Sequence, residues 1–465
     1  MKNTKRILAQ FTFYDRTGIQ KLLEKQAQKG WLLEKMTSFG WKFRRIEPQN
    51  IHYAVTYFPE ASMFDPEPGE KQKSFWELCE HTGWKLAASN AQMQIFYNEK
   101  ENPVPIETDP QTELETIEKS AKKSYLVSYW LLTACTVIQI ALGLWQFGMD
   151  PVEYLSRNSS LFSALCWISL LAMCLMEIIG YFRWHKKAVK AIEETGSFIE
   201  TRGYRNIQLA LMWVVLAIFV VFLFSIEWKF AIIAVVTSVF IGCISATVWG
   251  FSALLKKFKV SAKANRIATI IAIGVVSVGA SAFMIFTVLN MVMETGWFDK
   301  EPAYTYEYKG REWEVYDDEL PLMVEDMIET DYDGFSTNWY GSESVFLSKH
   351  DAYQRPRMDA LAQPYLQYTM VKVNMPFLYN FAFKQTLKDF PHNHGVTEED
   401  YELYEYAVEI DASEWGANRA YQIYVADNPR EEYLLCYNKC IIVLHPDLDM
   451  ELTPQIKANV GKTLG

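Results

Sequence analysis

One carboxylate inside an otherwise apolar segment is the first residue of this chain that could do chemistry. Glu177 stands in a long apolar run, and Gln139 and Gln146 stand in the run before it. Buried acids in membrane helices can move protons or ions, but such relays normally place ionisable groups on several helices. We therefore expect the Glu177 side chain to extend toward the cations Arg183 and Lys186. Glu177 and Gln139 form a candidate polar site within the membrane.

Two short clusters near the C-terminus could form a disulfide or bind a metal. Cys436 and Cys440 flank a three-residue turn, which predicts either a disulfide or two free thiols on neighbouring strands. We favour free thiols, because so short a turn needs no covalent closure. His392 and His394 stand just before the acidic residues 398–400, but a proline and a glycine beside them indicate a loop. We predict no metal site and no cofactor.

The first hundred residues carry no recognisable catalytic motif. His52 and His81 are isolated, Cys79 has no companion at metal-ligand spacing, and no Gly-rich phosphate loop or Gly-x-Ser-x-Gly occurs. Asp15 invites a catalytic interpretation, but the Arg-Thr-Gly that follows is more typical of a turn or a helix N-cap. The sequence therefore predicts a protein that is not an enzyme.

Five long apolar runs must position Glu177 and Gln139. Each is close to the ~20 residues that cross a hydrocarbon core of ~30 Å as a helix. The predicted spans cover residues 125–147, 161–182, 207–226, 230–254 and 267–293. They assign residues 125–294 to a bundle of five transmembrane helices in a multi-pass protein of the cell membrane.

The loops between these runs predict the orientation. Cytoplasmic loops retain an excess of Lys and Arg. Such residues gather before the first run, after the second and after the fourth: Lys119, Lys122, Lys123, Arg183, Lys186, Lys187, Lys190, Arg202, Arg205, Lys256, Lys257, Lys259, Lys263 and Arg266. The opposite loops carry only Arg157, Lys229 and, after the last run, Lys300. An odd number of spans then places the N-terminus in the cytoplasm and the C-terminus outside the cell.

Small residues recur along the fourth run. Gly242, Ala246 and Gly250 repeat at four-residue spacing, which lets two helix backbones approach closely. We interpret them as a packing face within the bundle, with homodimerisation as the alternative. The lipid bilayer is the partner that the apolar runs predict directly.

Residues 1–100 repeat one pattern: a helix, Gly-Trp, then strands. The first copy has a helix at 18–29, Gly30-Trp31 and strands at 32–36, 41–46 and 52–58; the second has a helix at 74–81, Gly83-Trp84 and strands at 85–89 and 93–97. Each glycine predicts a left-handed helix cap and each tryptophan a buried anchor. We expect an α+β domain with one sheet of four to six strands and both helices on one face. Residues 101–124 predict an acidic, proline-bearing linker and a short pre-membrane helix.

Several spaced motifs in this domain follow the pattern of a known family. They are Phe11-x-Phe13-Tyr14-Asp15, Ala27-x-x-Gly30-Trp31-x-Leu33, Trp41-x-Phe43-x-x-Ile46-x-Pro48, Tyr53-x-Val55-x-Tyr57-Phe58-Pro59, Cys79-x-x-x-Gly83-Trp84 and Gln94-Ile95-Phe96-Tyr97. Over about the first 110 residues, the chain resembles DUF2812, a domain of unknown function found mainly in Firmicutes at the N-terminus of multispan membrane proteins. The resemblance transfers no catalytic residue. It implies a regulatory setting by association only, because family members often occur beside PadR-type transcriptional regulators.

Residues 295–465 carry the acidic excess of the chain. The whole chain has a net charge of -11, and from residue 296 onward there are 31 Asp and Glu against 14 Lys and Arg, which leaves a net charge of +6 for the rest. A nucleic-acid binder that works through bulk charge would be basic, so we predict no nucleic-acid partner. Aromatic-rich runs predict an extracytoplasmic α+β domain of antiparallel hairpins. The expected strands are 305–308, 313–316, 344–347, 365–373, 403–410, 420–425, 432–437 and 440–444, and the expected helices are 321–329, 375–388 and 454–462.

This layout predicts a non-enzymatic regulatory or sensor protein of the membrane. An extracytoplasmic domain would be coupled to a cytoplasmic protein partner through spans that hold few polar groups. The alternative is a transport accessory subunit or permease-like membrane protein, for which Gln139 and Glu177 would supply polar groups within the bundle.

Overall fold

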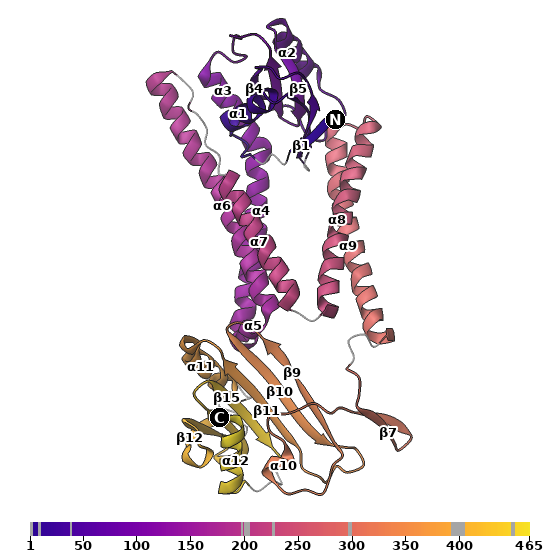
Figure 1. Cartoon of the computed structure of the whole chain (residues 1–465), viewed down its shortest axis with the longest axis vertical. Coiled ribbons are helices and arrows are strands. Elements are labelled where there is room, and N and C mark those ends of the chain that lie inside the picture. Colours follow the sequence, from indigo (N-terminus) through magenta and orange to yellow (C-terminus); the bar gives the residue numbers. More distant parts are fainter. Residues whose placement is uncertain are drawn as a thin grey trace. The chain divides into compact units, whose positions relative to one another are not determined.

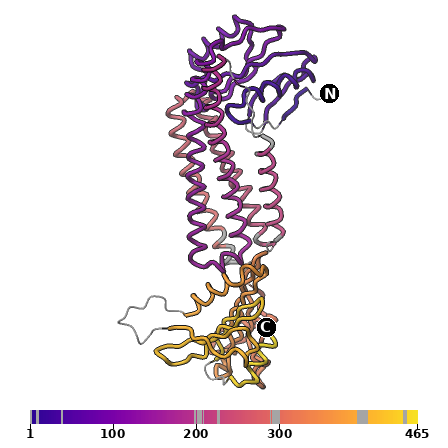
Figure 2. The backbone as a smooth tube through the Cα atoms, turned by 90° about the vertical axis from the view of Figure 1, so that its left-hand side faces the viewer, coloured from indigo at the N-terminus to yellow at the C-terminus, as the bar shows by residue number. Residues whose placement is uncertain are grey.

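The computed structural model describes residues 3–7, 11–37, 40–196, 199, 205–225, 228–295, 300–391, 405–447 and 452–465. The chain divides into two compact units (Figures 1 and 2). Unit 1 comprises Met1–Ile140 and Cys166–Met291, and unit 2 comprises Ala141–Leu165 and Val292–Gly465. Unit 1 therefore contains an N-terminal α/β domain and most of the long helices, and unit 2 contains a sheet-rich C-terminal domain.

The N-terminal domain contains two antiparallel three-stranded sheets (Figure 1). β1 (Thr4–Ile7), β2 (Trp31–Thr37) and β3 (Gly40–Arg45) pair in the order β1-β3-β2; β4 (His52–Tyr57), β5 (Lys85–Asn90) and β6 (Met93–Asn98) pair in the order β4-β6-β5. The helices are α1 (Arg16–Ala27) and α2 (Glu70–His81). The expectation of a single sheet is wrong, because β4 pairs with β6 of the second copy and not with β3. β1, which the sequence did not predict, pairs with β3 instead.

Local sequence explains where these elements begin and end. Asp15 caps α1, since its carboxylate accepts a hydrogen bond from the backbone N–H three residues later at 3.1 Å. Gly30 and Gly83 have φ of +78° and +94°, which confirms the predicted left-handed caps and favours glycine at both positions. Trp84 is buried as predicted, whereas Trp31 is only half-buried.

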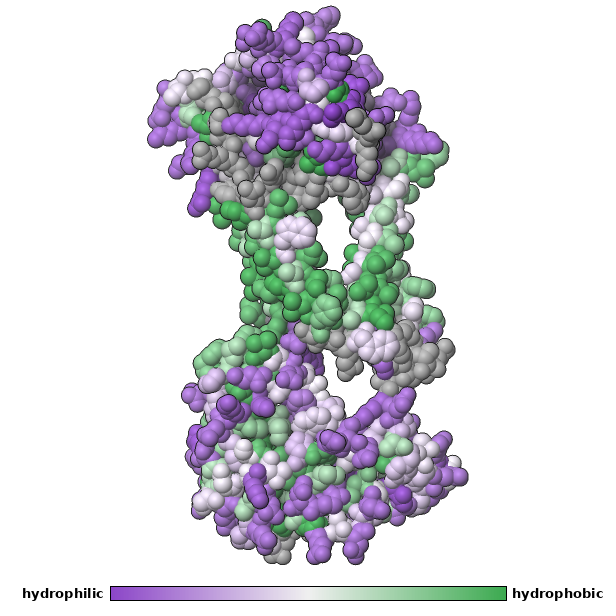
Figure 3. All heavy atoms as spheres, viewed as in Figure 1, coloured by the Kyte–Doolittle hydropathy of each residue, from purple (hydrophilic) through white to green (hydrophobic). Residues whose placement is uncertain are grey.

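The apolar runs form long helices (Figure 2). α3 (Pro110–Ser120), the π-helical turn η1 (Ala121–Tyr125) and α4 (Leu126–Met149) follow one another without a break; then come α5 (Pro151–Ser156), α6 (Asn158–Thr195), α7 (Arg205–Ser225), α8 (Trp228–Lys257) and α9 (Ala262–Thr295). Within the described residues, four helical stretches are long and apolar enough to cross a membrane: Pro110–Met149, Asn158–Thr195, Ala231–Lys257 and Ala262–Thr287. The third predicted span is a shorter apolar helix, Leu209–Phe224, within α7. Hydrophobic side chains cover the visible face of these helices (Figure 3), as in a membrane protein.

The C-terminal domain is built on one antiparallel sheet of seven strands, as the predicted hairpins imply. The order is β12-β13-β14-β15-β11-β10-β9, and β7 and β8 form a separate hairpin. The strands are β7 (Tyr304–Tyr308), β8 (Arg311–Val315), β9 (Phe335–Glu343), β10 (Leu347–Pro356), β11 (Leu366–Val373), β12 (Glu405–Ile410), β13 (Arg419–Val425), β14 (Asn428–Cys436) and β15 (Cys440–Pro446). The helical segments are α10 (Val324–Met327), η2 (Pro376–Leu378), α11 (Tyr379–Asp389), η4 (Ser413–Trp415) and α12 (Pro454–Leu464). The predicted strand at 344–347 is wrong except for its last residue, because residues 344–346 connect β9 to β10 and Leu347 begins β10.

Alternate residues of the seven strands point into two separate cores. Tyr368 and Leu444 pack with Trp415 in one core, and Val371 and Ile441 pack with α11 in the other. Since successive side chains of a strand point to opposite faces, each face of the sheet is covered by its own helices. α5 belongs to the second core.

Candidate functional site

The N-terminal domain packs on the helices of unit 1 through aromatic side chains. We call this group the aromatic seam; its members are Phe13, Tyr14, Tyr125, Tyr129, Tyr181 and Trp184. The same core includes apolar residues of α3, η1, α4 and α6: Leu114, Ile117, Ala121, Leu126 and Ala188. The domain and these helix ends therefore share one hydrophobic core and are not joined by a flexible tether.

The rings of the seam are in direct contact. Tyr14 stacks on Trp184 with centroids 5.0 Å apart, and Phe13 stacks on Tyr125 at 5.2 Å. Tyr181 packs edge-on against Tyr14 at 5.9 Å. Tyr14 and Tyr181 are each only 2% exposed. Such pairs contribute about 0.5–1.5 kcal/mol each beyond the burial of their area.

Helical spacing brings these residues to one place. Tyr125 and Tyr129 are four residues apart, and Glu177, Tyr181 and Trp184 follow the i, i+4, i+7 pattern of one helix face. The sequence reasoning missed the seam, although this spacing at the basic ends of two apolar runs was a usable signal.

Glu177 lies beside the seam and does not reach solvent. Its side chain is 4% exposed, and the Tyr125 hydroxyl donates a hydrogen bond to it. The expectation that Glu177 extends toward Arg183 and Lys186 is therefore wrong. A buried carboxylate is costly unless it is hydrogen-bonded, and Tyr125 supplies such a bond. Gln139 is exposed on α4, about 21 Å of helix beyond Tyr125, so it does not join Glu177 in one site.

Tyr125 is the last residue of η1. A π-helical turn is rare, and such turns often occur at functional sites. Here the turn ends where α4 begins, at the residue that contacts both Phe13 of the domain and Glu177 of α6. Tyr125 therefore joins three elements: the N-terminal domain, α4 and α6.

A buried ion pair connects α1 to α3 in the same domain. The Arg16 guanidinium pairs with the Glu113 carboxylate. Burial lowers the pKa of Arg16, and the nearby Glu107 carboxylate acts in the opposite direction. Burial also raises the pKa of Glu107, an effect that Arg16 partly offsets. Because α3 continues into α4, this pair links the domain to the first long helix.

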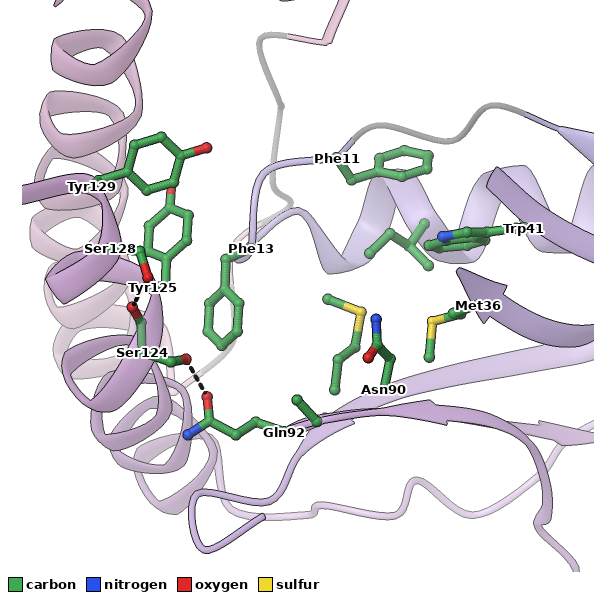
Figure 4. Close-up of a pocket in the computed structure, with 13 residues that line it drawn as sticks. Phe11, Phe13, Met36, Trp41, Asn90, Gln92, Ser124, Tyr125, Ser128 and Tyr129 are labelled. Carbon is green, nitrogen blue, oxygen red and sulfur yellow. Dashed lines mark hydrogen bonds between the residues drawn. The ribbon is translucent and has the colours of Figure 1, made fainter. Parts of the chain in front are cut away.

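A pocket of about 390 Å³ opens beside the seam (Figure 4). Its polar residues Asn90, Gln92, Ser124 and Ser128 and its tyrosines Tyr125 and Tyr129 come from the β5–β6 hairpin, from η1 and from the start of α4; Phe11, Phe13, Ile19, Met36, Trp41, Ala91 and Met93 complete the lining. In Figure 4, Phe13 lies between Tyr125 and the side chains of Met36 and Trp41. The pocket therefore has one wall from the domain and one from the first long helix.

A second pocket, of about 520 Å³, lies where the 61–72 loop meets α8. Close to it, Lys259 pairs with Glu67 at 2.8 Å, and the Asn265 side-chain amide donates to the Phe64 carbonyl at 3.2 Å. These contacts hold the end of α8 and the start of α9 against the N-terminal domain. Neither pocket is lined by Glu177 or Gln139.

The N-terminal domain and the start of α4 match a known protein family. Residues 15–129 match the DUF2812 family model, described as a protein of unknown function. No curated protein and no solved structure matches the chain. The DUF2812 region begins at the helix cap Asp15 and ends at Tyr129, so it includes η1 and the first turn of α4. Tyr181 and Trp184 of the seam lie beyond it, on α6.

Outside the DUF2812 region, α5 docks on the sheet of unit 2 through polar contacts. The Lys349 ammonium lies 3.2 Å from Asp150 and 3.1 Å from Glu153. Burial acts to lower the pKa of Lys349, but the two carboxylates raise it above its ordinary value. The Ser344 hydroxyl donates to the Leu155 carbonyl at 2.6 Å. We call these contacts, together with buried Val152, the α5 docking site.

The remaining predicted residues lie apart from both regions. Cys436 and Cys440 are free, buried thiols, and burial raises the pKa of each to about 12. Gly242 and Gly250 face open space on α8: a Cβ built there meets no described atom within 4 Å, and Ala246 between them is exposed. The 392–400 cluster with its two histidines lies outside the described residues. Within the described ranges, no three His, Cys, Asp or Glu side chains gather as metal ligands would.

Proposed function

We propose that this chain is a non-enzymatic, multi-pass membrane protein of regulatory type. In it, α4, α5 and α6 couple an extracytoplasmic C-terminal domain to the cytoplasmic DUF2812 region, which contacts a protein partner. One observation carries the proposal: the continuous segment formed by α4, α5 and α6 supplies core residues to both domains. Leu126, Tyr181 and Trp184 belong to the core of the N-terminal domain, and Val152 and Leu155 belong to a core of the C-terminal domain.

The helix ends in unit 1 support the proposed five-span topology. The start of α4, the end of α6, the end of α8 and the start of α9 all contact the N-terminal domain. Since α6 and α8 both end at this domain, α7 must cover the distance in the opposite direction to α8. These ends also carry the Lys and Arg clusters that are expected in the cytoplasm.

Coupling requires an element with two arrangements that both domains influence. The contacts of Tyr125 fit this requirement, because a displacement of α4 relative to α6 changes its hydrogen bond to Glu177 and its stacking on Phe13. A packed aromatic cluster responds to such a displacement in discrete steps, since its rings cannot compress.

Cysteine accessibility tests the orientation. In a background without the natural cysteines, Ser159→Cys and Ser261→Cys each place a thiol at an exposed position. A membrane-impermeant maleimide should label the first in intact cells and the second only after permeabilisation. Equal labelling of both in intact cells contradicts the topology.

Hydrogen exchange on the full chain in nanodiscs tests the coupling. Lys349→Met should loosen the α5 docking site and also speed amide exchange around Tyr125 and Trp184. Lys372→Met, which changes an exposed lysine on β11, is the matched control and should change neither. Faster exchange in α5 with unchanged exchange at the seam contradicts the coupling.

Crosslinking and pull-down from membranes test the proposed protein partner. They should recover a partner only while residues 1–100 are present.

A further inference from the structure

The pocket beside the aromatic seam has an uncharged lining. Its volume of about 390 Å³ falls within the range of ~300–1,000 Å³ that is usual for small-molecule sites. Among the described residues that line it, none is Lys, Arg, His, Asp or Glu. A charged group that entered would lose hydration without gaining a counter-ion, which costs several kcal/mol or more. The lining therefore selects an uncharged ligand.

The polar wall of the pocket offers hydrogen-bond acceptors. The Ser124 hydroxyl donates to the Gln92 side-chain oxygen at 2.7 Å, and the Ser128 hydroxyl donates to the Ser124 carbonyl at 2.9 Å. Each hydroxyl has thus committed its single proton and keeps lone pairs that can accept. A ligand that carries free hydroxyl groups matches this wall. The opposite wall, with Phe11, Phe13 and Trp41, matches an apolar body (Figure 4).

The position of this wall on α4 indicates where the ligand comes from. Ser128 is followed along α4 by exposed apolar side chains, with Trp130 52% and Leu131 66% exposed. Exposed tryptophans are typical of a membrane interface, and Trp130 is such a residue next to the pocket. The pocket therefore lies at headgroup depth, where membrane lipids are the most abundant amphiphiles.

We propose that this pocket binds an uncharged lipid with free hydroxyl groups, of the monoacylglycerol class. The glycerol hydroxyls donate to Ser124 and Ser128, and the start of the acyl chain packs against Phe11, Phe13 and Trp41. The inference rests on the proposed membrane placement of α4 and does not require the proposed coupling between domains.

Photolabelling of the full chain in nanodiscs tests this site. The probe is a monoacylglycerol with a diazirine near its ester, and the comparison probe is the fatty acid with the same diazirine. The neutral probe should label peptides that contain Trp41, Met93 or Ser128, and unlabelled monoolein should compete. The fatty acid, compared at an alkaline pH of about 9 at which it is ionised in the bilayer, should label them about ten-fold less. Equal labelling by both probes, or labelling without competition, overturns the proposal.

Two substitutions locate the binding to the pocket. Ser128→Trp fills the space and should reduce labelling about ten-fold, whereas Val127→Trp changes the neighbouring side chain, 54% exposed and outside the lining, and should leave labelling intact. Ser128→Ala removes only one acceptor and should reduce labelling about five-fold, even if the larger substitution disturbs folding. Unchanged labelling in the alanine variant, or equal losses in Val127→Trp and Ser128→Trp, contradicts the assignment.

Discussion

The aromatic seam and the α5 docking site hold the two ends of the α4–α6 segment by different chemistry. At the seam, six aromatic side chains pack on one another, and one of them, Tyr125, donates a hydrogen bond to a carboxylate that is 4% exposed. At the α5 docking site, one lysine pairs with two carboxylates, Asp150 and Glu153, and the Ser344 hydroxyl donates to the Leu155 carbonyl of α5. The first depends on shape and burial, and the second depends mainly on charge.

This difference predicts which end responds to the surrounding solution. Aromatic packing is nearly insensitive to salt and to pH, whereas ion pairs weaken as ionic strength rises and as their members titrate. Contacts made by ion pairs, as at the α5 docking site, weaken or strengthen with the salt concentration and the pH of the solution. Contacts made by packed aromatic rings, as at the seam, change only when a helix moves. Such an arrangement suits a segment that senses at one end and reports at the other.

Loss of a seam ring should cause the largest effect. Trp184→Ala removes a buried indole that stacks on Tyr14, and truncations of this kind cost about 3–5 kcal/mol. The N-terminal domain should detach from α6, which hydrogen exchange in α1 would detect. Ile168→Ala on the same helix is the control, because Ile168 is 55% exposed and lies outside the core of the N-terminal domain. Similar effects of the two substitutions would contradict the central role of the seam.

Removal of one member of the buried ion pair should rank second. Glu113→Gln leaves the Arg16 guanidinium buried beside a neutral amide, and breaking a buried pair in this way costs about 3 kcal/mol. The double variant Arg16→Met with Glu113→Leu should recover part of the loss, since neither member of the pair is then buried alone; the recovery is incomplete because Glu107 loses the nearby cation that partly offsets its burial. Thermal unfolding of all three variants checks this order. A double variant no more stable than Glu113→Gln would show that the pair itself is required.

Removal of the Tyr125 hydroxyl should have an intermediate effect. Tyr125→Phe leaves the ring stacking in place and deletes the hydrogen bond to Glu177; the loss of one hydrogen bond to a buried carboxylate costs about 2 kcal/mol. Local opening free energies from hydrogen exchange near residues 121–129 should fall by that amount. Tyr129→Phe changes a neighbouring hydroxyl at the pocket and should lower them less. Equal changes in the opening free energy for the two substitutions would show that the hydrogen bond to Glu177 does not stabilise the seam.

The long helices and the glycine caps could be predicted from the sequence because both are local. An apolar run of sufficient length specifies a helix by itself, as α4 and α6 show. The left-handed caps at Gly30 and Gly83 depend only on the backbone angles of these two residues. β9 and β10 were missed because they carry many polar residues, and the sheet that β4 joins depends on a partner some forty residues away.

The seam could not be predicted because it joins residues that are distant in the sequence. Tyr14, Tyr125 and Trp184 come from three separate segments, and composition gives no information on which faces meet. The error on Glu177 has the same origin. The sequence showed cations a few residues away at Arg183 and Lys186, whereas the hydrogen bond comes from Tyr125 on another helix.

The α5 docking site should give the smallest effect and the clearest dependence on solution conditions. Lys349→Met should weaken docking by about 1 kcal/mol, as expected for a partly exposed ion pair. Folding raises the pKa of Lys349 above 10.5, so the protonated form is favoured in the folded state. The contribution is therefore complete below pH 10 and is lost as the pH rises through the higher folded value.

Hydrogen exchange of α5 as a function of pH and salt measures this contribution, once intrinsic exchange rates are taken into account. In the natural protein, protection should fall at high salt and at strongly alkaline pH, while protection at the seam falls less. The Lys349→Met variant should lose both dependences at α5, and the small salt response of the seam, which the proposed coupling transmits from α5, should decrease with it. If salt weakened both ends equally in the natural protein, charge would hold the seam as well, and the chemical contrast between the two ends would be wrong.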